Sequence, residues 1–304
     1  MTPVDMLESL KDHLDAPDNF WSNKQLWRRL TDATAEIVRD IAKEDATYFV
    51  QTSDLSLVAD QATYSLPLNA RLGSRIIFAG NTGTGSDPEN VEIPPTRLRE
   101  LLDFSTPGAL SLSSTYHFAL QAGKVRIIPT PTASTTNSIR IYFIPNHGNM
   151  IQGTASAGGS STLTFFTGDP NWTTNYGEPD VRDDYYNGMQ ILIYAGTGIG
   201  QQREITDYSG GSSRIVTVDS AWSVTPDSTS KFAVMCAVPE DHHSVVVTRA
   251  ALAGTIKGRT RNRELHREYY GHLGAPGVLK DLLGWVQKRQ DATLDSVIPL
   301  DMGA

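Results

Sequence analysis

Residues 196–200 have the sequence GTGIG and follow an apolar run, which is where a phosphate-binding loop would lie. A dinucleotide-binding loop has the spacing G-x-G-x-x-G and leads into a helix whose first amides meet the phosphate. Here the third glycine comes one position early, and residues 201–208 alternate in the manner of a strand. The pattern therefore predicts a β-hairpin turn and no nucleotide cofactor.

Asp180, Asp183 and Asp184 stand near Glu178 in a predicted loop. Clustered carboxylates can bind calcium, which takes about six to eight oxygen ligands, and a pair of carboxylates can hydrolyse a glycosidic bond. The spacing of an EF-hand is absent. The simplest interpretation is a solvated acidic loop, with calcium left open and a hydrolase as the least favoured alternative.

Few other residues are candidates for catalysis. His242 and His243 are adjacent, so on a helix their side chains point about 100° apart and do not easily share one metal ion. The sequence holds neither H-E-x-x-H nor G-x-S-x-G. Its one cysteine, Cys236, lies between apolar residues, which predicts a buried structural thiol. We expect no catalytic residue, no metal site and no cofactor, and hence a protein that is not an enzyme.

The one concentration of basic residues is the run KGRTRNR at residues 257–263. Two interpretations stand equally: a solvated helix face that pairs with acids of the same helix, or a subunit interface that meets an acidic surface on another copy of the chain. Binding to exposed duplex DNA comes third. The predicted interface residues are Arg259, Arg261, Arg263 and Arg267, of which the first, third and fourth share a helical face.

The 304 residues, 39% of them hydrophobic, suffice for a sizeable core and for about two domains. No apolar run approaches the roughly 18 residues of a membrane-spanning helix, and the polar N-terminal sequence is unlike a secretory signal peptide. The single cysteine excludes a disulfide framework. A net charge of −8 argues against a general nucleic-acid binder, because phosphate contacts need clustered Lys and Arg. We expect a soluble protein of a reducing compartment.

A hydrophobic period of 3.6 residues predicts an amphipathic helix over residues 22–48. Ser22 and Gln25 have the spacing of a capping box at its start, and a shorter helix is predicted over residues 3–14. From residue 47 to residue 144 the period changes to two, which predicts strands. The predicted strands are residues 62–67, 75–79, 116–120, 124–128 and 139–144, and residues 94–102 fit a short helix between them.

The composition changes at Gly148, and residues 153–161 have the Gly- and Ser-rich sequence of a flexible linker. Short, evenly spaced strands follow, which predicts a small barrel or sandwich. They are residues 162–166, 189–194, 202–208, 214–218 and 231–237. The module holds nine acidic and four basic residues, so it carries most of the negative excess. Its exposed aromatic residues are predicted to be Trp172, Tyr176, Tyr185, Tyr186 and Trp222, of which the first four form the predicted contact surface.

The helical period returns after Pro239 and predicts a long helix over residues 241–270 and a last helix over residues 278–290. The predicted fold class is α+β: a helical bundle of N- and C-terminal helices, a β-rich segment, and a large inserted all-β module of barrel or sandwich type. The predicted domains are a core of residues 1–150 and 238–290, the inserted module of residues 151–237, and an extended tail of residues 291–304.

The order of these elements resembles that of a known family. An amphipathic helix leads to ATYSLP at residues 62–67, then to GKVRIIPTP at 123–131 and IYFIP at 141–145. This order is similar to that of the head–tail adaptor, or connector, proteins of tailed bacteriophages, which sit beneath the portal in the virion neck. The module, with DYYNGM at residues 184–189, is similar to small β-modules of phage neck and tail proteins.

The resemblance implies a structural virion protein that forms a homo-oligomeric ring, typically of twelve copies, around the DNA channel. It would be assembled in the host cytoplasm, with the portal protein and tail, nozzle or tail-fibre proteins as partners. Genomic DNA would pass without specific binding, because an acidic lining repels phosphate. The apolar tail residues predicted to dock on the portal are Leu294, Val297, Ile298 and Leu300. Plain fraying of the terminus is the alternative.

The role of the inserted module is left open by the resemblance, since shorter adaptors lack so large an insertion. The module could contact a tail protein, a fibre or a neighbouring copy, or its aromatic side chains could stack on sugars. The alternative function is therefore a tail-associated or carbohydrate-binding protein whose module recognises a glycan or a tail fibre.

Overall fold

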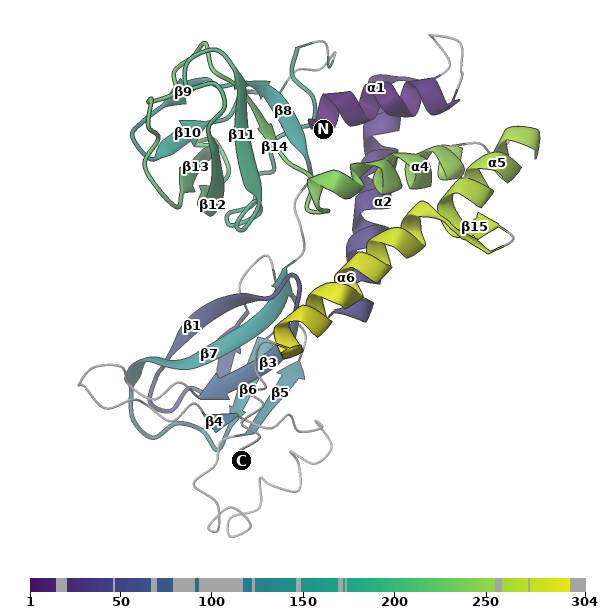
Figure 1. Cartoon of the computed structure of the whole chain (residues 1–304). Coiled ribbons are helices and arrows are strands. Elements are labelled where there is room, and N and C mark those ends of the chain that lie inside the picture. Colours follow the sequence, from purple (N-terminus) through teal and green to yellow (C-terminus); the bar gives the residue numbers. More distant parts are fainter. Residues whose placement is uncertain are drawn as a thin grey trace, which may run out of the picture. The chain divides into compact units, whose positions relative to one another are not determined.

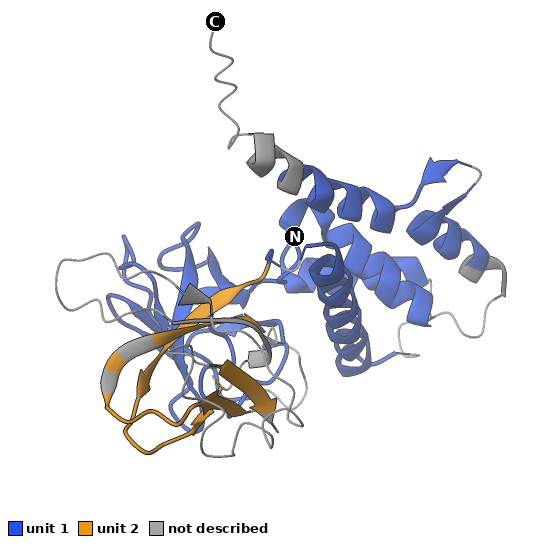
Figure 2. Ribbon diagram, turned by 90° about the horizontal axis from the view of Figure 1, so that it is seen from below, with its two compact units in different colours: residues 1–48, 147–304 blue, residues 49–146 orange. Residues whose placement is uncertain are grey.

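The computed structural model of the chain combines helices and sheets, as the sequence predicts. It divides into two compact units: Met1–Tyr48 with His147–Ala304 form unit 1, and Phe49–Asn146 form unit 2 (Figure 2). The structure describes residues 1–14, 21–45, 47–66, 70–78, 91–92, 117–121, 124–145, 149–168, 172, 174–254, 259–272 and 274–295. The two units are defined by contacts between residues. The predicted domain boundaries at residues 150, 238 and 290 stay a prediction.

The helices of unit 1 pack on one another (Figure 1). The predicted capping box is present: Ser22 Oγ accepts a hydrogen bond from Gln25 N at 3.3 Å, and Gln25 Oε1 accepts one from Ser22 N at 3.0 Å. α4 packs against α1, α2 and α5, and α6 packs against α2 and α5. The helices in the described residues are α1 (Pro3–Leu14), α2 (Asn23–Glu44), the 3₁₀ helix η1 (Glu240–His242), α4 (His243–Gly254), α5 (Arg259–Tyr270) and α6 (Val278–Asp295).

The C-terminal helices differ from the prediction at two places. The single helix predicted over residues 241–270 is wrong, because η1, α4 and α5 take its place, with residues 255–258 outside the description. α4 ends at Gly254, where a Cβ would lie 2.8 Å from Leu14 Cδ2 of α1. Glycine leaves room for the Leu14 side chain at this contact, and it also favours a helix end. α6 continues to Asp295, past the predicted end at Gln290.

The module after residue 150 is an antiparallel sheet in the order β8-β14-β11-β12-β13-β10-β9 (Figure 1). Its core includes Phe165 and Phe232, whose rings stack with centroids 4.7 Å apart. The turn predicted at residues 196–200 joins β11 to β12, and its three glycines have φ between +80° and +84°. The strands are β8 (Ile151–Thr154), β9 (Ala157–Gly158), β10 (Thr162–Thr164), β11 (Gln190–Ala195), β12 (Gln202–Ser209), β13 (Ile215–Val218) and β14 (Lys231–Val234). β15 (Gly271–His272) and β16 (Ala275–Pro276) pair separately, between α5 and α6.

The flexible linker predicted over residues 153–161 is wrong, because β8 and β9 occupy part of this segment. A Cβ on Gly153 would lie 2.3 Å from Asn175 Oδ1, and one on Gly158 would lie 2.2 Å from Pro226 O. Only glycine permits approaches this close. These glycines therefore serve packing, although their composition is that of a linker.

Unit 2 is made of strands, and it contains a four-stranded sheet in the order β1-β7-β3-β4 and a three-stranded sheet in the order β2-β6-β5. Apolar side chains of these strands, such as Tyr64, Phe118 and Ile139, form its core. Each strand predicted between residues 62 and 144 is present, and the short helix fitted to residues 94–102 lies outside the described residues. The strands are β1 (Gln51–Leu57), β2 (Thr63–Ser65), β3 (Ala70–Phe78), β4 (Val91–Glu92), β5 (His117–Gln121), β6 (Lys124–Ile128) and β7 (Thr135–Pro145). In neither unit is a described helix long and apolar enough to cross a membrane.

Candidate assembly surfaces

The side chain of Trp27 joins α2 to the module. It is 3% exposed, and its Nε1 donates a hydrogen bond to Met150 O at 3.1 Å. Its ring stacks on Tyr176 with centroids 5.7 Å apart and meets the Trp172 ring at right angles at 5.9 Å. Next to this cluster, Gln152 Oε1 accepts a hydrogen bond from a backbone N–H of α1 at 3.0 Å. Buried aromatic and polar contacts thus fix the module to α1 and α2.

Cys236 lies on the same seam between module and helices. Its Sγ is 3.7 Å from Thr34 Oγ1 of α2, and burial raises the pKa of the thiol. A raised pKa favours the protonated thiol, which is a poor nucleophile. The prediction of a buried cysteine is confirmed.

The aromatic surface predicted for the module is wrong in part. Trp172, Tyr186 and Trp222 are only 6%, 0% and 5% exposed, and Tyr186 belongs to the module core. Large aromatic rings supply much of the apolar area that a small sheet can bury, so they tend to lie in its core. These three buried rings are therefore not available to stack on sugars. Tyr176 and Tyr185 are partly exposed, and a contact role for the predicted set stays a prediction.

A pocket of about 620 Å³ opens at the seam between α2 and the module. Its lining joins the buried rings of Trp27 and Trp172 to charged groups of both signs, including Lys24, Asp32 and Glu178. Lys24 Nζ lies 3.1 Å from Glu178 Oε1 and 5.6 Å from the centroid of the Trp172 ring. Because the charges compensate one another, the pocket favours neither an anion nor a cation, and we assign it no ligand.

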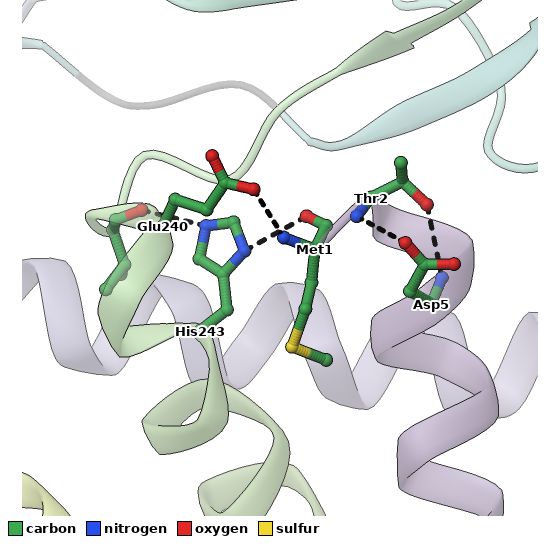
Figure 3. A network of polar contacts seen from close by, with 6 residues as sticks. Met1, Thr2, Asp5, Glu240 and His243 are labelled. Carbon is green, nitrogen blue, oxygen red and sulfur yellow. Dashed lines mark hydrogen bonds and ion pairs between the residues drawn. The ribbon is translucent and has the colours of Figure 1, made fainter. Parts of the chain in front are cut away.

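A polar network ties the first residue to the connection between the module and α4 (Figure 3). The Met1 ammonium lies 2.7 Å from Glu240 Oε1 and lowers the pKa of that carboxyl. His243 Nδ1 lies 3.1 Å from Met1 O, and its Nε2 lies 3.0 Å from Val238 O. Burial of this 2% exposed ring lowers the pKa of His243. Sequence reasoning missed this role, because the first contact joins residues 242 positions apart.

The acidic loop of the module is held by internal contacts. The Arg182 guanidinium donates to both oxygens of Asp180 at 2.8 Å, which holds the pKa of that carboxyl below its usual range. Asp183 Oδ1 accepts a hydrogen bond from Gly210 N at 2.8 Å. Across the described part of the chain, no group of three or more His, Cys, Asp or Glu residues is arranged to hold a metal ion.

α5 has one buried side and one exposed basic side. Leu265 and Tyr269 are 4% and 2% exposed, and the Arg249 guanidinium of α4 lies 5.9 Å from the centroid of the Tyr269 ring. Residues spaced i, i+3, i+4 and i+7 share another side of the helix and are exposed. We call this set the α5 basic face, and it consists of Arg263, His266, Arg267 and Tyr270.

Arg263 and Arg267 of the predicted subunit interface lie on the α5 basic face. In the part of the chain that the structure describes, no ion pair involves either of them. Arg259 and Arg261 also belong to α5, but their side chains lie outside the description. The interface role of these arginines stays a prediction.

The predicted portal-docking residues fall at the end of α6. Leu294 belongs to the last turn of that helix, so its backbone is helical instead of extended. The helical period continues there because nothing in residues 291–295 breaks it: glycine and proline are both absent. Val297, Ile298 and Leu300 lie outside the described residues, and docking through this segment stays a prediction.

The family of the chain is shown by comparison with known protein families. The family described as SU10 adaptor protein matches residues 1–195, well over half of the chain. The chain belongs to this family. The resemblance to phage adaptor proteins, inferred from the order of the elements, is thereby confirmed. A search of curated proteins found no match.

The SU10 adaptor match covers α1, α2, unit 2 and the module as far as β11. The first strands of the module therefore fall within the pattern of the SU10 adaptor family. Strands β12 to β14 and the C-terminal helices, α5 included, lie beyond the matched residues. The match therefore carries no information about the α5 basic face.

Proposed function

We propose that this member of the SU10 adaptor family is a structural virion protein that joins the capsid to the tail. In this proposal it forms a homo-oligomeric ring, typically of twelve copies, below the portal and around the DNA channel of the virion neck. The role requires no catalytic site and no cofactor. The observation that carries the proposal is the family match over residues 1–195.

The charge of the chain supports a channel that DNA passes without binding. The net charge is −8, and a negative lining repels phosphate, which prevents the non-specific attraction that would hold DNA in place. The α5 basic face is a local exception. We assign it to the contact between subunits, because a cationic patch in the channel would retain the DNA that has to move.

The remaining partners follow from the position in the neck. The end of the chain, with Leu294, Val297, Ile298 and Leu300, is proposed to dock on the portal protein. The partly exposed Tyr176 and Tyr185 of the module are proposed to contact a tail or tail-fibre protein. Assembly in the host cytoplasm precedes incorporation into the virion.

Light scattering combined with negative-stain images tests this function. The purified chain is measured alone and mixed with the portal protein of the same virus, and we expect a ring in one of the two samples. A variant truncated after Asp295, which leaves α6 whole, should keep its helical circular dichroism and lose portal binding. A full-length chain that stays monomeric in both samples would overturn the proposal.

A further inference from the structure

The module carries a second charged surface, opposite in sign to the α5 basic face. It lies on the exposed side of β12 and on the segments next to it. Four of its carboxylates are exposed and the fifth, Asp184, is half-buried. We call this set the module acidic face, and it consists of Asp183, Asp184, Glu204, Asp207 and Asp219.

An irregularity in β12 lets two of these carboxylates, Glu204 and Asp207, both face solvent. The register with β13 shifts between Ile205 and Asp207, as at a β-bulge, and a bulge breaks the strict alternation of side chains. Ile205 and Tyr208 remain buried, while Glu204 and Asp207 both face solvent. Asp219 is held beside them, because its Oδ1 accepts a hydrogen bond from Glu204 N at 3.2 Å.

The carboxylates of this surface have no ion-pair partner among the side chains that the structure describes. The guanidinium of Arg203 instead donates to the backbone carbonyls of Gln202 and Ala221. Burial raises the pKa of Asp184, and repulsion from Asp207 and Asp183 raises it further.

The two charged faces lie at opposite ends of unit 1. α1, α2 and α4 stand between the module and α5 (Figure 1), so within one copy the faces do not meet. A contact between two different surfaces of identical chains is heterologous, and such contacts close into rings when the rotation is right. Opposite placement is therefore what a head-to-tail ring needs.

We propose that the α5 basic face of one copy docks on the module acidic face of a second copy. This inference rests on the proposed ring and names the contact that builds it. Arg263 and Arg267 supply planar guanidinium groups that bind carboxylates bidentately. Tyr270, 51% exposed, supplies a large side chain beside them, of the kind enriched at protein interfaces. The choice of a second copy rests on charge complementarity between two surfaces that the same chain carries.

Charge-swap variants test the contact. One variant carries Arg263→Glu and Arg267→Glu, and the other carries Asp183→Lys and Asp207→Lys. The matched control is Lys124→Glu with Arg126→Glu, two exposed residues of β6 in unit 2, which changes the net charge as much as the first variant. Native mass is measured by light scattering at low and high salt, alone and with the portal protein, and circular dichroism checks that every variant is folded.

Each swapped variant alone should lose oligomers, with an apparent dissociation constant raised at least tenfold. An equimolar mixture of the two should restore them, because each copy then offers the charge that its neighbour lacks. The control should assemble like the original chain. Association should weaken as salt rises, since exposed charges are screened over about 10 Å at 0.1 M.

Oligomers that form normally in both swapped variants would overturn this contact while leaving the proposed ring intact. A chain that never oligomerises, alone or with portal, would overturn both. Duplex DNA offers a third outcome: if the original chain binds it in a fluorescence anisotropy titration, and the arginine variant loses binding without any change of mass, the α5 basic face is a phosphate site and the proposal fails.

Discussion

The ring nitrogens of His243 face two carbonyl oxygens, Met1 O and Val238 O. A neutral imidazole has one N–H and satisfies one of them, whereas the imidazolium donates to both. Burial and the Met1 ammonium oppose the charged form and lower the pKa of His243, against the smaller effects of the two carbonyls and Glu240. The lowered pKa favours the neutral imidazole, in which the ring donates to only one of the two carbonyls.

This balance predicts how stability depends on pH. Because the pKa of His243 is lower in the folded state, the unfolded chain takes up this proton first. The free energy of unfolding should therefore fall as the pH drops below about 6.5, the ordinary pKa of histidine. Urea denaturation at several pH values would show a shallower fall for His243→Gln, while the exposed His272→Gln should keep the original slope. Equal slopes in all three proteins would mean that His243 does not titrate in this range.

At the scale of the element, features set by neighbours in the sequence could be predicted, and features set by distant residues could not. The capping box at Ser22 is formed by neighbours in sequence, and it predicts the start of α2 to the residue. Gly158 gives no such signal, because the atom that demands glycine, Pro226 O, belongs to a residue far along the chain. The prediction that Trp172 is exposed is wrong for the same reason, because the ring that covers it, Trp27, lies in α2.

A glycine pair in the module tests this distinction. Gly158→Ala places a Cβ against the backbone of Pro226 and should reduce the free energy of unfolding by about 1–3 kcal/mol through overpacking. Gly168→Ala is the matched control, because a Cβ there meets nothing within 4 Å, and it should change stability by no more than about 0.5 kcal/mol. Urea denaturation measures both. A Gly158 variant as stable as its control would restore the interpretation of this segment as a flexible linker.

The α5 basic face and the module acidic face differ in the same way: only the first could be predicted from neighbours in the sequence. Helical spacing is local, so Arg263 and Arg267 could be placed on one face from the sequence alone. The module acidic face could not, because it depends on the bulge in β12 and on the register with β13. An excess of acids in the module was visible in composition, but which of them remain without a partner is decided by the fold.

At the scale of the whole molecule, unit 1 joins segments that the sequence suggests are separate. Trp27, Thr34 and the first turn of α1 all contact residues of the module or its borders. Unit 2 has a core formed by its own strands. A module that was merely inserted would leave the helices intact when removed, whereas one that completes their packing would not.

Two complementary deletions distinguish these cases. Replacing residues 151–234 by a short Gly/Ser linker exposes Trp27. Burial of a large apolar side chain is worth about 1.5–3 kcal/mol, a considerable share of the roughly 5–15 kcal/mol typical of a domain. We expect this variant to lose cooperative thermal unfolding, followed by circular dichroism. Replacing residues 49–146 in the same way removes unit 2 with its own core, so unit 1 should still unfold cooperatively. The opposite pattern, with stable helices after loss of the module, would show that the helices fold without it. The contacts of Trp27 would then serve to orient the module toward a neighbouring copy in the proposed ring.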